Sequence, residues 1–162
     1  LLDPLTGLWN RRAGEQILDR EFCKVREQGA LLGLAVLDLD RFKAINDLHG
    51  HATGDVVINL AAEIVVQEIG DKGIAWRFGG EEFVVVFPGA SEEGMRNRCE
   101  RILSAFHEKA RFRAGHEWLS FTTSVGGAVA TAEMRSGLDL FVAADTALRK
   151  AKEDGRDRVQ VV

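Results

Sequence analysis

An apolar stretch broken by two glycines and two glutamates does most to restrict how this chain can fold. Residues 74–78 read IAWRF and residues 83–87 read FVVVF, and between them lies GGEE at 79–82. Two strand-like segments joined by a glycine pair predict a β-hairpin, because glycine adopts the positive φ angles of tight hairpin turns. A buried strand has no use for adjacent carboxylates, so we expect the tip of this hairpin to carry a function.

The length of the chain is that of one globular domain. Its 162 residues contain no internal repeat, and the longest apolar run, residues 30–37, is far shorter than the roughly 20 residues of a membrane-spanning helix. We therefore expect a single soluble domain over residues 1–162, with no membrane contact by this segment. Because residue 1 is not methionine, we also expect the chain to be a fragment of a longer protein.

Charge and cysteine content exclude some functions. The formal net charge of −4 argues against a general nucleic-acid binder, because such proteins carry an excess of Lys and Arg that neutralises phosphates. Cys23 and Cys99 lack metal-ligand or redox spacing, which favours reduced thiols in the cytoplasm. This expectation leaves room for a membrane anchor elsewhere in the full-length protein.

Helical and strand-like patterns alternate along the rest of the chain. Apolar side chains recur at helical spacing in residues 11–28, and residues 31–39 form an aliphatic run typical of a buried strand. The other expected elements are a helix that Asp55 caps and that ends at 70–73, a helix from Ser91, a strand at 117–130, a helix between Ser136 and Gly155, and a short strand at 159–162. This order indicates a mixed α and β fold.

The strand at 31–39 leads into an acidic pair. Asp38 and Asp40 share one face, because side chains repeat every second residue along a strand. If Asp38 also approaches Glu81, repulsion between carboxylates about 4 Å apart amounts to about 4 kcal/mol at an effective dielectric constant of about 20. A hard divalent cation removes this repulsion, and oxygen ligands favour magnesium or manganese over zinc. The alternative is that both aspartates simply end the strand in contact with solvent.

A polar segment follows the acidic pair and supplies groups that suit a nucleotide. Lys43 has the charge to neutralise a phosphate, and Asn46 and Asp55 suit a guanine edge, since an aspartate accepts from the N1 and N2 hydrogens of guanine. Taken singly, these residues have simpler interpretations as a surface charge, a turn former and a helix cap. His49 and His51 suggest zinc, but no third soft ligand lies near them in the sequence.

A cationic pair lies near the other end of the chain. Lys152 and Arg156 bracket Gly155 at the end of an expected helix. Cations are favourable at a helix C-terminus in any case, because of the helix dipole. The functional alternative is that the helix end directs both cationic side chains toward a triphosphate.

Five segments together resemble the successive signature blocks of GGDEF domains, the diguanylate cyclases of bacterial signalling. They are DPLTGLWNRR at 3–12, DLDRFKAINDLHGHATGD at 38–55, RFGGEEF at 77–83, TTSVGGA at 122–128 and ADTALRKAKEDGR at 144–156. The resemblance covers essentially the whole chain in order, with the GGEEF variant of the motif. It implies an α+β, palm-like fold with a ferredoxin-like βαββαβ core, related to class III nucleotide cyclases, in which helices flank a largely antiparallel sheet.

The resemblance also implies an activity, namely condensation of two GTP molecules into cyclic di-GMP and two pyrophosphates by a homodimer of GTP-loaded protomers. Magnesium or manganese would be the cofactor, with two ions in each active site, and an upstream sensory domain would control the enzyme. Carried over position by position, Asp38, Glu81 and Glu82 would be catalytic, and Asp38, the Leu39 carbonyl and Glu81 would hold the metal ions. Asn46 and Asp55 would bind guanine, while Lys43, Lys152, Arg156 and the backbone amides near Arg41 and Phe42 would hold phosphates, and Gly79 and Gly80 would form the turn beside the nucleotide.

Two departures from the family pattern matter. In many members an inhibitory product site, Arg-x-x-Asp, precedes the glycine pair; Gly70 and Gly73 occupy its positions here, so we expect no product inhibition through that site. Arg149 and Asp157 stand where Tyr and Asn are usual.

Two other functions stay open as alternatives. One is an inactive module that binds GTP or cyclic di-GMP and regulates a neighbouring domain, and the other is a hybrid cyclase with a mixed guanine and adenine product. The intact GGEEF motif argues against the first, and the acidic Asp55 argues against the second.

Overall fold

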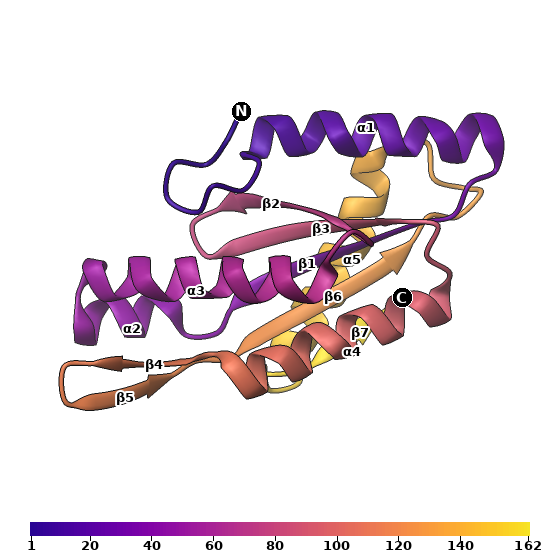
Figure 1. Ribbon diagram of the computed structural model, residues 1–162. Coiled ribbons are helices and arrows are strands. Elements are labelled where there is room, and N and C mark those ends of the chain that lie inside the picture. Colours follow the sequence, from indigo (N-terminus) through magenta and orange to yellow (C-terminus); the bar gives the residue numbers. More distant parts are fainter.

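A five-stranded sheet in the order β2-β3-β1-β6-β7 forms the centre of the computed structural model, which describes residues 1–162 (Figure 1). The elements are α1 (Arg11–Gln28), β1 (Leu32–Leu39), α2 (Phe42–His49), α3 (His51–Ile69), β2 (Ile74–Gly79), β3 (Glu82–Pro88), α4 (Glu92–Lys109), β4 (Arg111–Ala114), β5 (Glu117–Ser120), β6 (Thr123–Val129), α5 (Gly137–Glu153) and β7 (Val159–Val161). Strand β1 pairs antiparallel with both β3 and β6, and only β7 joins in parallel. The expected α+β fold with a largely antiparallel sheet and a βαββαβ core is confirmed.

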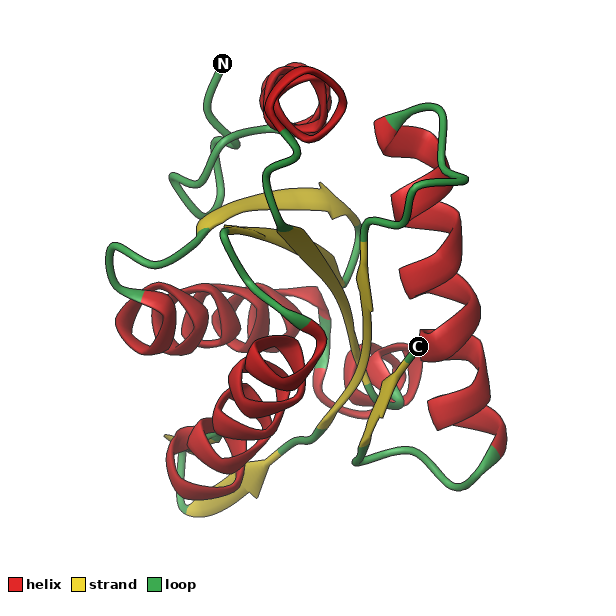
Figure 2. Ribbon diagram, turned by 90° about the vertical axis from the view of Figure 1, so that its right-hand side faces the viewer, coloured by secondary structure: helices red, strands yellow, loops and turns green.

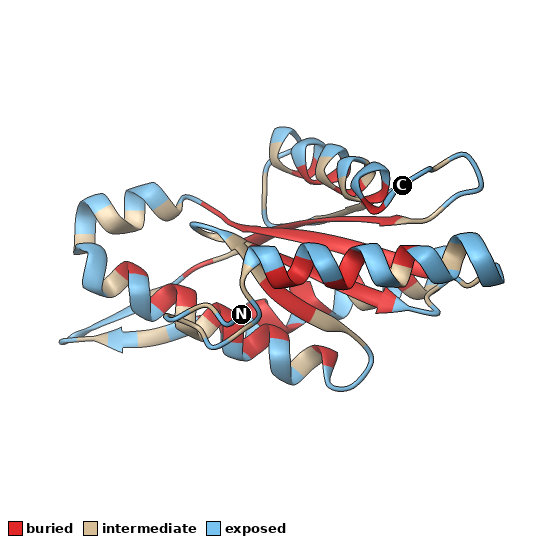
Figure 3. Ribbon diagram, turned by 90° about the horizontal axis from the view of Figure 1, so that it is seen from above, coloured by how far each residue is buried: buried red, intermediate tan, exposed pale blue.

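Helices cover both faces of this sheet, as Figure 2 shows in end view. All eight residues of β1 are buried, because the strand lies in the middle of the sheet between the two helical layers. Leu34 and Val36 pack in the apolar cluster with α1 and α5, while Ala35 and Leu37 pack in the cluster with α3 and α4. This alternation follows the two-residue period of a strand, and it explains why the sequence of β1 is aliphatic throughout. Figure 3 shows the buried residues along the sheet and on the inner sides of the helices.

Three of the long helices, α1, α4 and α5, begin at side-chain caps. Asn10 accepts a hydrogen bond from the Ala13 amide at the start of α1, and Ser91 and Ser136 cap α4 and α5 in the same way. The hairpin of β2 and β3 is also confirmed. Of its two glycines, Gly80 has a positive φ of 43°.

Two expectations about secondary structure are wrong. Asp55 does not cap a helix: α3 begins at His51, and a separate helix, α2, precedes it with Gly50 between them at a φ of 92°. The expected strand at 117–130 is two strands, β5 and β6, interrupted at residues 121–122, and β5 pairs with β4 in a small hairpin of its own. Because β4 and β5 are joined by a turn, the local pattern of strand-forming residues did not reveal that β5 pairs with β4 outside the main sheet.

No helix combines the length and apolar character needed to cross a membrane.

Candidate active site

Asp38 lies at the end of the central strand and is only 6% exposed. In the sheet it faces Glu82 of β3 on one side and Ser124 of β6 on the other. The ammonium group of Lys152, from the last turn of α5, donates a hydrogen bond to Oδ2 of Asp38. The structure thus brings together Asp38, the second glutamate of the hairpin motif and Lys152, one of the predicted phosphate-binding residues.

The electrostatic state of this cluster follows from its burial. Burial raises the pKa of Asp38, and the charges of Glu81 and Asp40 raise it further, although Lys152 acts in the opposite direction. Burial and the Asp38 charge likewise raise the pKa of Glu82. Several carboxylates therefore share a poorly solvated region in which one ammonium group does not compensate them fully. Such a region attracts additional positive charge.

The hairpin tip is joined to the end of β1. The Leu39 amide donates a hydrogen bond to the Glu81 carbonyl over 3.1 Å. Glu81 is therefore held next to the strand end that carries Asp38, and its charge contributes to the raised pKa of Asp38. A methyl group built at Gly79 or Gly80 would meet nothing within 4 Å, so the turn leaves open space beside the carboxylates.

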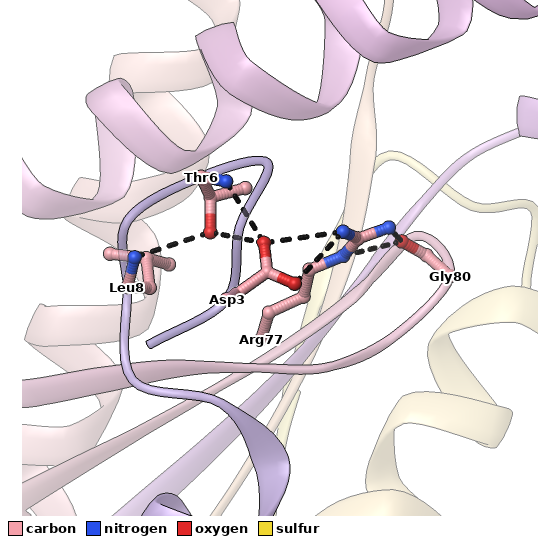
Figure 4. Close-up of polar contacts among 5 residues, drawn as sticks. All are labelled: Asp3, Thr6, Leu8, Arg77 and Gly80. Atoms are coloured by element: carbon pink, nitrogen blue, oxygen red, sulfur yellow. Dashed lines mark hydrogen bonds and ion pairs between the residues drawn. The ribbon is translucent and has the colours of Figure 1, made fainter. Parts of the chain in front are cut away.

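A contact from the N-terminal loop, absent from the sequence-based predictions, also fixes the hairpin tip. Arg77 donates to both carboxylate oxygens of Asp3 over 3.2 Å, and it donates to the Gly80 carbonyl from Nε over 3.1 Å and from Nη2 over 2.9 Å (Figure 4). Asp3 in turn accepts from the amide and hydroxyl of Thr6. Burial raises the pKa of Asp3, but these bonds outweigh it and lower the pKa overall.

The sequence gives a local indication of one part of this contact, the pairing of Asp3 with Thr6. The spacing of Asp3 and Thr6 is typical of a turn closed by an aspartate side chain. Its long-range partner Arg77 carries no such signal, because it stands 74 positions away inside a strand.

Asp40 has a different environment from Asp38. Its carboxylate accepts from the hydroxyls of Thr122 and Ser124 over 2.6 Å each and from the Asp157 amide over 3.0 Å. The aspartate is 5% exposed. The alternative in which both aspartates end the strand in solvent is therefore wrong, and Asp40 ties β1 to β6 and to the loop after α5.

The predicted nucleotide-binding residues after β1 lie on α2 and α3. Arg41, at a φ of 55°, immediately precedes α2, whose first residue is Phe42. Lys43 is exposed and pairs with Asp47 over 3.0 Å. Asn46 and the exposed Asp55 lie on the two neighbouring helices. The Oδ1 atom of Asn46 is enclosed and has no hydrogen-bond donor.

The remaining predicted cation lies in the loop after α5. Arg156 has a φ of 65° and contributes its backbone carbonyl as an acceptor for Arg158. Its side chain is not joined to Asp38, unlike that of Lys152. The loop is held at Asp157, whose amide donates to Asp40 and whose carboxylate lies 2.6 Å from Nε2 of His107.

The residues around Asp38 fit magnesium better than zinc. No group of three or more His, Cys, Asp and Glu side chains is arranged to hold a metal ion by itself. Magnesium is commonly bound by one or two carboxylates together with substrate phosphates, whereas structural zinc requires a full set of protein ligands. Asp38 lies beside the hairpin tip that carries Glu81, with open space at the turn, and this arrangement matches the first pattern.

Comparison with known proteins gives a consistent result. The family model described as diguanylate cyclase, GGDEF domain, matches residues 1–158. Diguanylate cyclase DgcP of Pseudomonas aeruginosa is 42% identical over 161 residues, which cover 99% of this chain and 24% of that protein. Diguanylate cyclase DosC of Escherichia coli is 34% identical over 99% of this chain and 35% of its own length. The chain thus spans about a quarter to a third of these curated relatives.

Solved structures match over nearly the whole chain. The GGDEF domain of DgcB from Caulobacter crescentus, in complex with c-di-GMP, has a TM-score of 0.90 and 35% identity over 99% of this chain and 92% of its own. Diguanylate cyclase SiaD of Pseudomonas aeruginosa, in complex with its activator SiaC, has a TM-score of 0.94 and 34% identity over 99% of this chain and 61% of its own.

Proposed function

The chain belongs to the GGDEF family of diguanylate cyclase domains, and we propose that it condenses two molecules of GTP into cyclic di-GMP with release of two pyrophosphates. The observation that carries the proposal is the junction of β1 with the hairpin tip, where the Leu39 amide binds the Glu81 carbonyl, the Glu81 charge acts on Asp38, and the turn leaves open space. The 3′-hydroxyl of each GTP attacks the α-phosphorus of the other, and pyrophosphate leaves. Two such attacks close the ring.

The proposed roles of the residues follow from their positions. Asp38, the Leu39 carbonyl and Glu81 would hold divalent cations, magnesium or manganese, with two in each site. When bound, these ions stabilise charge on the phosphates and lower the pKa of the attacking hydroxyl. Glu82 faces Asp38 across the strand pair and adds negative charge to the same region.

The nucleotide would extend from this junction toward α2 and α3. Asn46 and Asp55 would bind the guanine, whose edge offers both acceptors and donors. Lys43, Lys152, Arg156 and the amides near Arg41 and Phe42 would bind the phosphates. Gly79 and Gly80 would form the turn beside the nucleotide, where a side chain would occupy the open space.

Each protomer presents one GTP in this proposal, so a cyclic product requires two protomers facing each other. Proximity of the two bound nucleotides then supplies much of the rate. We also propose that the domain is part of a longer cytoplasmic signalling protein, in which an upstream sensory domain brings two copies together. The chain spans only about a quarter to a third of the length of the curated relatives, which supports that proposal.

The test is product identification. The purified chain is incubated with GTP and magnesium, pyrophosphate is measured, and the nucleotide product is identified by mass. We expect cyclic di-GMP from the native chain and none from Glu81→Ala, with Glu63→Gln on the exposed side of α3 as the control that retains activity. Binding of GTP without any product by a dimeric preparation would instead support the inactive regulatory module.

A further inference from the structure

Gly54 lies buried in the first turns of α3, where that helix meets α2. Gly50 alone separates α2 from α3, and the chain reverses there so that the two helices lie side by side (Figure 1). Phe42 and Asn46 are four positions apart, so they share one face of α2. A glycine on α3 therefore faces two residues that belong to the proposed nucleotide site.

The space in front of Gly54 is filled by Asn46. A methyl group built at Gly54 would lie 1.8 Å from Oδ1 of Asn46 and 3.1 Å from Cζ of Phe42. The same Oδ1 atom is enclosed and receives no hydrogen bond. An enclosed carbonyl oxygen without a donor is unfavourable, and such exceptions concentrate at functional sites.

The atoms that a side chain at Gly54 would meet indicate that this glycine positions Asn46 rather than maintains the fold. At Gly126 a methyl group would lie 2.2 Å from the backbone nitrogen of Leu148 and 2.3 Å from the Ala144 carbonyl oxygen, so the packing of α5 on β6 requires glycine there. At Gly54 the obstructed atoms are the ends of two side chains. These ends can swing aside, which changes the position of the Asn46 amide rather than the fold.

We infer that Gly54 is a positioning residue for guanine recognition. Because position 54 has no side chain, the carbonyl end of the Asn46 amide rests against α3, and the Nδ2 end is left to donate to an acceptor on guanine. Asp55, the next residue along α3, supplies the complementary acceptor for the guanine N1 and N2 hydrogens. The inference rests on the proposed function, and it adds a residue that does not itself touch the nucleotide.

A double-mutant cycle between Gly54→Ala and Asn46→Ala tests the inference. Affinity is measured by calorimetry with a GTP analogue whose α and β phosphorus atoms are joined by a methylene group, which blocks release of pyrophosphate. We expect Gly54→Ala to weaken binding about three- to tenfold, as for loss of one hydrogen bond. In the Asn46→Ala background the same change should alter affinity less than about twofold, because no amide remains to be displaced.

Thermal stability of the same four proteins provides a second readout. If Gly54→Ala lowers the melting temperature, adding Asn46→Ala should restore it, because the methyl group then has room. Gly94→Ala, where a methyl would meet only Ser91 Oγ at 3.3 Å and Ala90 at 3.9 Å in the first turn of α4, is the matched control and should leave affinity unchanged.

Three results would overturn the inference. They are unchanged affinity in Gly54→Ala, an equal loss of affinity with and without Asn46, and a melting temperature that Asn46→Ala fails to restore. Failure of the native chain to bind the analogue at all would be a different outcome, since it contradicts the proposed function itself.

Discussion

The ammonium group of Lys152 binds the same Asp38 carboxylate that would hold a divalent cation. A metal ion and Lys152 therefore compete for one buried group, and Lys152 is free to turn toward a phosphate only when it releases Asp38. We expect Lys152→Met to bind manganese several-fold more tightly without nucleotide, and to bind GTP more weakly. Electron paramagnetic resonance of free manganese measures the first effect.

The control for that experiment lies on the same helix. Lys150 pairs with Asp154 over 3.0 Å on the exposed side of α5, so Lys150→Met removes an equal charge away from the site. Equal manganese affinity in native chain and Lys152→Met would show that Lys152 does not compete for Asp38.

Removal of the Asp38 charge should stabilise the fold. The raised pKa means that the folded chain binds this proton more tightly than the unfolded chain, so the ionised carboxylate costs stability at neutral pH. The cost disappears as the pH falls below the ordinary carboxyl pKa of 3.8. We expect Asp38→Asn, measured without divalent cations, to melt a few degrees higher at neutral pH, with the difference shrinking toward acid. A lower melting temperature at neutral pH would mean that the pair with Lys152 outweighs the burial of the charge.

Loss of the Arg77 contacts should loosen the hairpin tip. The side chains of Arg77 and Asp3 are only 18% and 15% exposed, so Arg77→Ala leaves a poorly solvated carboxylate without its partner and costs about 1–3 kcal/mol. We expect faster amide hydrogen exchange at residues 79–82 and lower cyclase activity. Arg101→Ala removes an exposed pair with Glu68 and serves as control. Unchanged exchange at the tip would show that Arg77 does not hold it.

Turnover should be insensitive to added cyclic di-GMP. Gly70 and Gly73 have no side chains to bind a product phosphate or base, and a methyl at Gly73 would already lie 2.9 Å from Phe87 and 3.0 Å from Val85. We expect the initial rate of pyrophosphate release to stay constant over low micromolar cyclic di-GMP. Suppression that a substitution at Gly70 or Gly73 modifies would contradict this.

Local patterns in the sequence predict much of this fold. The aliphatic run of β1, the glycine-broken hairpin, the helical spacing of α1 and the helices that begin at Ser91 and Ser136 each follow from periodicity or from a cap within a few residues. The start of α3 was misplaced, because Asp55 resembles a cap, although the chain turns earlier at Gly50.

The contacts that complete the site are harder to predict. Lys152 and Asp38 are 114 positions apart, and Arg77 and Asp3 are 74 apart, so only the folded sheet reveals these pairs. The resemblance to GGDEF domains supplied candidate residues, but it did not show that the Asp40 carboxylate accepts three hydrogen bonds from the protein while the Asp38 carboxylate binds the ammonium group of Lys152.

The most direct test of the account is manganese binding in the presence of the unreactive GTP analogue, measured by electron paramagnetic resonance. Asp38 comes from β1 and Glu81 from the turn between β2 and β3. We expect Asp38→Asn and Glu81→Gln each to abolish tight, nucleotide-dependent binding, while Glu63→Gln retains it. Binding that survives both substitutions would contradict the claim that the end of β1 and the hairpin tip jointly hold the metal-bound triphosphate.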